Sequence, residues 1–452
     1  MFLGLPSSTS TTEMMPMIIP ATISDFFSLE TTILPPYKPY CNLYINKKTM
    51  VIFSVLCYAC SMKTIYLDNG ATSWPKAPTV ATAVASFIRE RAVNIGRGSY
   101  NRAYETALEI QACRDKLGKF FGASDSRNVT FSLNVTHALN TLIAGLFTAE
   151  DHVLVSGMEH NAVMRPLSQF GIPYSIIPCN AEGFLQIEQI PQLVTEHTKA
   201  IIMTQASNVT GSIQPVRDVA AIAKTYGLML LIDAAQLPLS SNLSLIADGI
   251  DAIAFTGHKS LLGPQGVGGL IVSDQLANLV KPWAAGGTGS KSALLQMPDF
   301  LPDKFEAGTQ NLPGIIGLSA ALDYINENKT DIIGHEQKLT EILLSAFLTD
   351  DRLRVIGPKD MCNRTSVISV DFPGLDNAKV ADMLFLRAGI ETRVGLHCAP
   401  IAHRSIGTFP SGTVRFSLGY ATTEEEIQKT IEACSQVLDD MHSKQFHTIA
   451  SE

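Results

Sequence analysis

The feature that most constrains the fold is a series of short, continuous apolar runs. They lack the alternation of polar and apolar residues that is typical of a strand with one face in water. These runs span residues 153–155, 200–203, 228–232 and 252–255. Strands that are apolar on both faces are typical of parallel sheets covered by helices on both sides. Helical periodicity lies between such runs, for example at residues 104–121 and 216–226, and a glycine follows each stretch. The pattern predicts a doubly wound α/β sheet, in which ligands bind beyond the carboxyl ends of the strands.

The last hundred or so residues differ in pattern. Strands are predicted at 367–372 and 413–418, and helices at 378–388 and 423–439. Helices packed on a small sheet would form a second domain. We therefore expect a large domain at 62–330, whose first segment packs on a small C-terminal α+β domain at 331–445, followed by a tail at 446–452.

The first 61 residues are rich in Ser, Thr, Pro and Met and contain no Arg. We expect these residues to be an extension that is disordered or not native, with Met62 as the true start. The alternative is an export signal, in which Lys47 and Lys48 precede the apolar run 50–59. That run is shorter than the ~20 residues a membrane span needs. Cys57 and Cys60 form a CxxC without a surrounding strand or helix pattern, which disfavours a redox or metal role.

The charge and the cysteine content of the sequence argue against several classes of protein. The net charge is −8 and no block of lysines or arginines occurs, so a nucleic-acid partner is not expected, nor is a membrane. The 8 cysteines lack the density and short spacings of a disulfide scaffold. We expect reduced thiols in a cytoplasmic protein.

Polar residues follow the predicted strands where such a sheet places its chemistry. Asp233 ends the run 228–232, Lys259 follows the strand 252–255, and Asn208 follows the strand at 200–203. An aspartate and a lysine at neighbouring strand ends form either a structural ion pair or the binding site of an aromatic aldehyde cofactor. Pyridoxal phosphate (PLP) needs a lysine amine for its Schiff base and an acid beside the pyridine nitrogen. Residues 134–137, at a predicted helix start, would suit its phosphate.

Eight sequence blocks, taken together, resemble one family. They are residues 66–72, 94–98, 159–161, 207–211, 233–236, 256–259, 305–309 and 395–399. In this order they are similar to the cysteine desulfurases and selenocysteine lyases, which belong to the class V aminotransferase group of fold-type-I PLP enzymes. The resemblance covers nearly everything from about residue 64 to 435. It implies a large domain with a mainly parallel seven-stranded sheet, a small α+β domain, and a homodimer.

The resemblance also implies roles for single residues. Lys259 would form the Schiff base, and Arg415, with Asn208, would bind the substrate carboxylate. The other implied cofactor contacts are Asp233 at the pyridine nitrogen, His160 stacked on the ring, Asn208 and Gln236 at its hydroxyl side, Thr136 and His258 at the phosphate, Val135 where the family often has a hydroxyl residue, and Thr288 at the partner subunit's phosphate.

Cys398 lies in a turn-rich segment, residues 395–410, with His397 and His403. No further ligand pair at zinc-like spacing accompanies them, so no metal is expected. Cys113 and Cys434, on helical stretches, are expected to be buried. The resemblance implies a desulfurase that converts L-cysteine to L-alanine and forms a persulfide on Cys398. An acceptor for iron–sulfur cluster or other thio-cofactor synthesis would then take the sulfur. A selenocysteine lyase, a PLP β-lyase, an aminotransferase and an inactive sulfur-relay partner remain alternatives.

Overall fold

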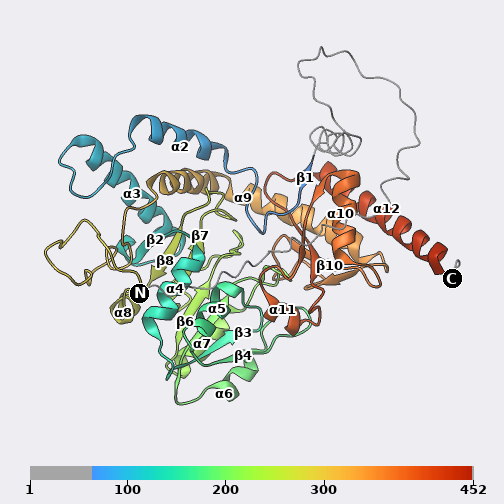
Figure 1. The fold of residues 1–452 in the computed structure, drawn as a ribbon, viewed down its shortest axis with the longest axis horizontal. Helices are drawn as coiled ribbons and strands as arrows, with labels where there is room; N and C mark the ends of the chain where they lie inside the picture. Colours follow the sequence, from blue (N-terminus) through green and yellow to red (C-terminus); the bar gives the residue numbers. More distant parts are fainter. Residues whose placement is uncertain (1–63, 450–452) are drawn as a thin grey trace, which may run out of the picture. The chain divides into compact units, whose positions relative to one another are not determined.

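The computed structural model describes residues 64–449 (Figure 1). The expected extension 1–61, its cysteines Cys57 and Cys60, and the expected start at Met62 lie outside the described residues. No helix within 64–449 combines the length and the apolar character that crossing a bilayer requires.

A seven-stranded sheet forms the centre of the larger part of the fold, in the order β2-β8-β7-β6-β5-β3-β4. Neighbouring strands are parallel from β7 to β4, and β8 is antiparallel to both β7 and β2. The strands are β2 (Val129–Ser132), β3 (His152–Ser156), β4 (Tyr174–Ile177), β5 (Thr198–Thr204), β6 (Met229–Asp233), β7 (Ala252–Thr256) and β8 (Gly268–Val272). The expected mainly parallel α/β sheet is confirmed.

Helices cover both faces of this sheet, which explains the continuous apolar runs. In β6, Leu230 and Ile232 join one hydrophobic cluster, while Leu231 joins another on the opposite face. The first cluster receives α2 (Pro78–Glu90), α3 (Asn101–Phe120), α7 (Val216–Thr225) and the first half of α9 (Leu312–Leu348). The second receives α4 (Val135–Leu146), α5 (Asn161–Gln169) and α8 (Asp274–Leu279). A polar residue at either face of these strands would lose its water.

A four-stranded antiparallel sheet, β12-β13-β10-β9, forms the second part of the fold. Its strands are β9 (Arg354–Ile356), β10 (Val367–Asp371), β12 (Arg393–Gly395) and β13 (Thr413–Ser417). One face packs on α10 (Asn377–Ala388), α12 (Glu424–Ile449) and the second half of α9. The long α9 therefore contributes to both hydrophobic cores. The domain boundaries themselves stay a prediction.

The N-terminal segment of the described chain joins this second part. Strand β1 (Ile65–Tyr66) pairs in parallel with β11 (Ile390–Glu391), and Asp68 forms a bridge with Ser417 of β13. The remaining short helices are α6 (Ile190–Leu193), α11 (Pro400–Ser405) and the 3₁₀ turns at Ser126–Asn128 and Ile187–Gln189. This pairing brings residues 68–73 close to the strand that carries Arg415.

Strand β13 alternates apolar and polar residues, yet both of its faces are interior. All five of its residues are buried, including Thr413, Arg415 and Ser417. The apolar face packs in the core with α9 and α12, and the polar face lies against residues 67–70 and Asn208. Arg415 is therefore an interior residue.

Candidate active site

Asp233 and Lys259 lie at the carboxyl ends of two neighbouring parallel strands. Asp233 is the last residue of β6, and one of its carboxylate oxygens accepts a hydrogen bond of 2.9 Å from the N–H of Ala235. Lys259 follows β7 by three residues, and its amine has no hydrogen bond or ion pair with any residue of the described chain. Burial lowers the pKa of this amine to about 8, an effect that the carboxylate of Asp233 opposes. The site therefore holds a half-buried lysine whose nucleophilic amine interacts with the charge of a carboxylate.

The start of α4 presents unpaired donors. The side chain of Asn134 caps the helix by accepting a 2.9 Å hydrogen bond from the N–H of His137, whereas the N–H groups of Val135 and Thr136 have no acceptor within the described chain. Thr256, at the end of β7, has a buried hydroxyl without a partner there. Free N–H groups at a helix start favour a phosphate.

Gly268 allows this helix start to lie against the end of β7. A Cβ at position 268 would lie 2.6 Å from the carbonyl oxygen of Phe255 and 3.0 Å from the backbone of Asn134. Any side chain at this position would push the two segments apart. The glycine therefore keeps the free N–H groups of α4 next to the strand that leads to Lys259.

His160 begins α5, and its Nδ1 accepts a hydrogen bond of 3.0 Å from the N–H of Ala162. Burial, together with the charges of Lys259 and Arg165, lowers the pKa of His160 to about 4. The imidazole is therefore neutral at pH 7, and a neutral flat ring is suited to stacking on an aromatic cofactor.

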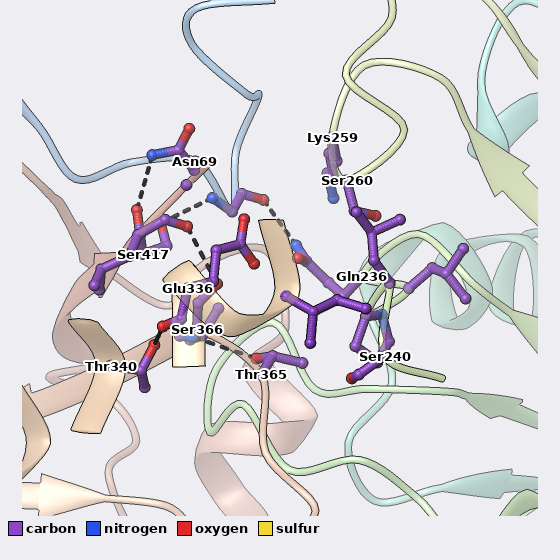
Figure 2. Close-up of a pocket in the computed structure, with 18 of the residues that line it drawn as sticks. Asn69, Gln236, Ser240, Lys259, Ser260, Glu336, Thr340, Thr365, Ser366 and Ser417 are labelled. Atoms are coloured by element: carbon purple, nitrogen blue, oxygen red, sulfur yellow. Dashed lines mark hydrogen bonds between the residues drawn. The ribbon is translucent and has the colours of Figure 1, made fainter. Parts of the chain in front are cut away.

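Residues 69–73 contact the loops around Lys259. The amide of Gln236 donates to the carbonyl of Gly70 at 2.7 Å, and a ring nitrogen of His258 lies 3.1 Å from the hydroxyl of Thr72. Burial, with the charges of Lys259 and Lys76, lowers the pKa of His258 to about 4. In Figure 2, Lys259 and Gln236 lie on one side of a cavity of about 90 Å³ and Asn69 lies on the other. The carboxyl group of Glu336, on α9, points into the same space.

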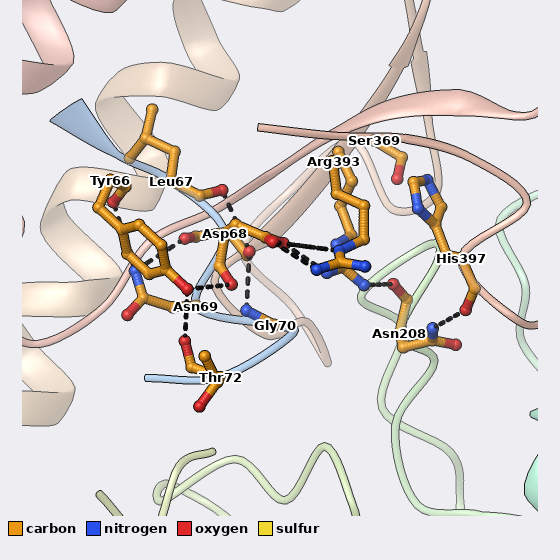
Figure 3. Close-up of polar contacts among 12 residues, drawn as sticks. Tyr66, Leu67, Asp68, Asn69, Gly70, Thr72, Asn208, Ser369, Arg393 and His397 are labelled. Atoms are coloured by element: carbon orange, nitrogen blue, oxygen red, sulfur yellow. Dashed lines mark hydrogen bonds and ion pairs between the residues drawn. The ribbon is translucent and has the colours of Figure 1, made fainter. Parts of the chain in front are cut away.

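Two arginines share one carboxylate in the part of the site drawn in Figure 3. Arg415 donates from Nη2 to Oδ1 of Asp68 at 2.9 Å and from Nη1 to the carbonyl of Asn208 at 3.1 Å. Arg393 donates from Nη2 to Oδ2 of Asp68 at 2.8 Å. Only 2% of the Arg415 side chain is exposed, compared with 48% of Arg393. Arg415 is therefore a buried cation that depends on this carboxylate.

Cys398 lies in a strained turn, and its side chain is exposed. His397 and Cys398 have φ angles of 49° and 57°, in the left-handed region that residues other than glycine rarely adopt. The carbonyl of Cys398 accepts a 2.8 Å hydrogen bond from the N–H of Asn161, and the carbonyl of His397 accepts one of 2.8 Å from the amide of Asn208. Strain of this kind persists where the surroundings impose it, and it is common at active sites.

The charged side chains that interact with Cys398 are those of Arg393 and Lys259, and not that of the preceding histidine. The ring of His397 is buried and bonds the hydroxyl of Thr413 at 2.9 Å. Burial, with the charges of Arg415 and His403, lowers the pKa of His397 to about 2, so the ring is neutral. Cys113 and Cys434 are buried, and burial raises the pKa of both thiols.

Thr288 is not brought to these residues. Its hydroxyl lies 3.3 Å from that of Ser290, and across residues 64–449 it contacts none of the other site candidates. No cluster of three or more potential metal ligands occurs in the described part of the chain.

Sequence reasoning assigned no role to Asp68, Arg393 or Thr256. Asp68 and Thr256 lie inside the blocks at 66–72 and 256–259, and Arg393 precedes the block at 395–399 by two residues. The only available signal was the position of these polar or charged residues within or beside a recognised block.

The residues present fit PLP. An unpaired buried amine at Lys259 suits an aldehyde, and the Asp233 oxygen that Ala235 does not occupy suits a ring nitrogen. The free N–H groups of α4 and the orphaned hydroxyl of Thr256 suit a phosphate. The comparisons with known proteins agree with this donor set, because the family model for class-V aminotransferases matches residues 65–430.

The chain belongs to the class-V aminotransferase family. Members of this family are enzymes that depend on PLP, and this chain is one of them. A probable cysteine desulfurase of Methanothermobacter thermautotrophicus is 33% identical over 82% of this chain and 94% of its own length. A cysteine desulfurase of Serratia proteamaculans is 30% identical over 82% and 93%.

Solved structures of this class-V aminotransferase family show the same fold. The apo cysteine desulfurase of Thermococcus onnurineus superposes with a TM-score of 0.76 at 26% identity, covering 83% of this chain and 95% of that one. The S-sulfonic acid form of a cysteine desulfurase of Escherichia coli gives a TM-score of 0.73 at 25% identity, covering 85% and 98%. These relatives place the chain in the cysteine desulfurase group of the family.

Proposed function

We propose that this enzyme converts L-cysteine to L-alanine and takes the sulfur onto the thiol of Cys398. The observation that carries the proposal is the exposed Cys398 in a left-handed turn, tied through Asn208 to the buried Arg415. A thiol beside a carboxylate-binding guanidinium suits an amino acid that carries sulfur on its β-carbon. A simple β-lyase or aminotransferase has no use for a thiol there.

Lys259 would hold PLP covalently, with Asp233 at the ring nitrogen and Gln236 and Asn208 on the hydroxyl side. His160 would stack on the ring, and the phosphate would lie against Val135, Thr136 and Thr256 at the start of α4, with His258 nearby. When bound, PLP supplies an electron-accepting ring that weakens the Cα–H bond of an amino acid.

The chain's own groups would perform the remaining steps. Arg415 binds the substrate carboxylate, because a guanidinium matches a carboxylate with two parallel hydrogen bonds. Once the substrate's own amine has displaced Lys259 from the cofactor, the freed amine of Lys259, with its pKa lowered to about 8 by burial, would take the proton from Cα. The thiolate of Cys398 then attacks the substrate sulfur. An S–S bond forms while the Cβ–S bond breaks, and its electron pair stays with carbon, which is protonated to give L-alanine.

The persulfide on Cys398 would pass to a thiol of a sulfur acceptor that serves iron–sulfur cluster or other thio-cofactor synthesis. We also propose a homodimer, in which Thr288 reaches the phosphate bound by the partner subunit. The half-buried loop position of Thr288, apart from its own chain's site, supports this arrangement. A cytoplasmic location follows from the cysteine content of the sequence and belongs to the same proposal.

The experiment is a desulfurase assay on the PLP-loaded enzyme, with alanine and sulfide measured together. We expect equal amounts of both from L-cysteine, and we expect Cys398→Ala to lose sulfur release while it keeps the visible absorption of lysine-bound PLP. Cys362→Ala removes another exposed thiol and serves as the matched control. Full sulfur release by Cys398→Ala would reject the thiol step. Absorption without alanine formation would move the function to a β-lyase or an aminotransferase.

A further inference from the structure

Asp68 occupies donors of the same guanidinium to which the substrate carboxylate is proposed to bind. Its Oδ1 accepts from Nη2 of Arg415 at 2.9 Å, and its two oxygens accept from Nε and Nη2 of Arg393 at 2.8–3.1 Å. Figure 3 shows the carboxylate of Asp68 directed at the guanidinium of Arg393. The protein thus supplies its own carboxylate at the point where a ligand carboxylate is needed.

The geometry around Arg415 leaves little room for a second carboxylate without a response from Asp68. Nη1 and Nη2 already have acceptors in Asn208 and Asp68, and Nε is buried without a partner. A Cβ at Gly70 would lie 3.1 Å from the central carbon of the guanidinium, so the segment 68–70 covers the group closely. A ligand carboxylate that pairs with Nη2 of Arg415 therefore competes with the Asp68 contact.

The charges in this cluster do not cancel. Two guanidinium groups, those of Arg393 and Arg415, contact the single carboxylate of Asp68. One net positive charge therefore remains to attract a ligand with a single carboxylate. The negative charge of Asp68 weakens this attraction, because it repels the ligand carboxylate and neutralises one of the two guanidinium charges. Without an anion, the two guanidinium groups would repel each other in a partly buried site.

We propose that Asp68 is an internal competitor of the substrate carboxylate, which holds Arg393 and Arg415 together in the empty site and lowers the affinity for amino acids. This inference rests on the proposed carboxylate site at Arg415. Asp68 acts through the two arginines and is therefore a positioning residue that sets affinity. Its backbone is held independently by the bridge to Ser417 and by the N–H of Ala71, which bonds its carbonyl at 3.0 Å. A change of its side chain leaves the path of the chain in place.

The test is calorimetric titration of the PLP-loaded enzyme with L-alanine, which carries the carboxylate and no sulfur. Asp68→Asn keeps the size of the side chain and removes its charge, and we expect L-alanine to bind about tenfold more tightly. The affinity for L-alaninamide, which lacks the carboxylate, should change by less than about twofold. In the desulfurase assay, KM for L-cysteine should fall more than kcat changes.

Glu391→Gln is the matched control, because Glu391, the last residue of β11, is a half-buried carboxyl that forms no ion pair in the described chain. It removes the same charge without touching either guanidinium, so the affinity for L-alanine should stay within about twofold. If Asp68→Asn folds poorly, Asp68→Ser removes the charge and keeps an oxygen. Equal or weaker binding of L-alanine by the folded variant overturns the competitor role and makes Asp68 a purely structural residue.

Arg415→Gln separates the two proposals. A loss of L-alanine affinity in Arg415→Gln, together with no gain in Asp68→Asn, overturns the role of Asp68 alone. Unchanged affinity in Arg415→Gln overturns the carboxylate site and the proposed function with it.

Discussion

The side-chain amide of Asn208 donates a hydrogen bond of 2.8 Å to the backbone carbonyl of His397. The backbone carbonyl of the same asparagine accepts from Arg415 at 3.1 Å. One residue on the loop after β5 therefore connects the proposed carboxylate site with the turn that carries Cys398. This connection links the segment that carries the thiol to the strand that carries the guanidinium.

Asn208→Leu should release the Cys398 turn. The leucine has a similar size but no donor for the carbonyl of His397, so the strained left-handed turn loses one of its restraints. We expect sulfur transfer to Cys398 to fall by about tenfold or more, because small misplacements of a nucleophile are costly. Persulfide on Cys398 after a single turnover is the measurement, with lysine-bound PLP absorption as a check on folding. Asn328→Leu removes an amide that bonds only within α9 and should have little effect. Undiminished transfer in Asn208→Leu would show that the turn holds without this bond.

Lys259 should react with PLP at a lower pH than an ordinary lysine. Its pKa is lowered to about 8 by burial, so the neutral amine becomes available as the pH rises through this value. The rate of absorption change after PLP is mixed with the cofactor-free protein should rise with a midpoint near pH 8. In Asp233→Asn the midpoint should move to lower pH, since the carboxylate that stabilises the ammonium form is removed. A midpoint near the usual lysine value would contradict the burial of the amine.

Glu159 should make the protein less stable as the pH rises. Its carboxyl is fully buried, one oxygen accepts from Ser156 and from the N–H of Thr204, and the other oxygen has no partner in the described chain. Burial raises the pKa of Glu159 from 4.5 to about 8. The protonated form stabilises the fold fully below pH 4.5, and this contribution is lost as the pH rises through about 8.

The measurement for Glu159 is the urea midpoint of unfolding across this pH range, compared with Glu159→Gln. Glutamine keeps the acceptor oxygen and does not ionise, so the variant should lose less stability between acid and neutral pH. Glu336, whose pKa burial also raises to about 8, should keep part of the dependence in the variant. Parallel pH curves for the two proteins would contradict the ionisation of Glu159.

Glu306→Gln should destabilise the fold strongly. Both oxygens of Glu306 accept from the buried guanidinium of Arg114 at 2.6 Å, and one also accepts from the N–H of Phe131. Removing one partner of a buried ion pair leaves an uncompensated charge, which costs about 3–5 kcal/mol. Glu424→Gln breaks the exposed pair with Lys338 and should cost less than about 1 kcal/mol. The unfolding free energies in denaturant provide the comparison, and similar losses in both variants would contradict the argument.

Local patterns in the sequence were sufficient for the central sheet. The runs at 200–203 and 252–255 lie within β5 and β7, and the run at 228–232 begins one residue before β6. Apolar residues at successive positions are needed wherever helices cover both faces of a strand. The positions of Asp233 and Lys259 at the strand ends follow from the same local order, since each lies within three residues of its strand. The family resemblance added roles for residues that the spacing of apolar residues in the sequence does not distinguish.

The sequence by itself thus determined the sheet, the strand-end lysine and aspartate, and the membership of the family, because these depend on the order of neighbouring residues. Only the tertiary structure decided that Asp68 meets Arg415 across 347 residues and that Asn208 meets His397 across 189. It also decided that the polar face of β13 is interior. The physical reason is that such contacts arise where separate segments pack against each other. Packing depends on the whole set of buried surfaces, and the spacing of residues along the chain does not specify it.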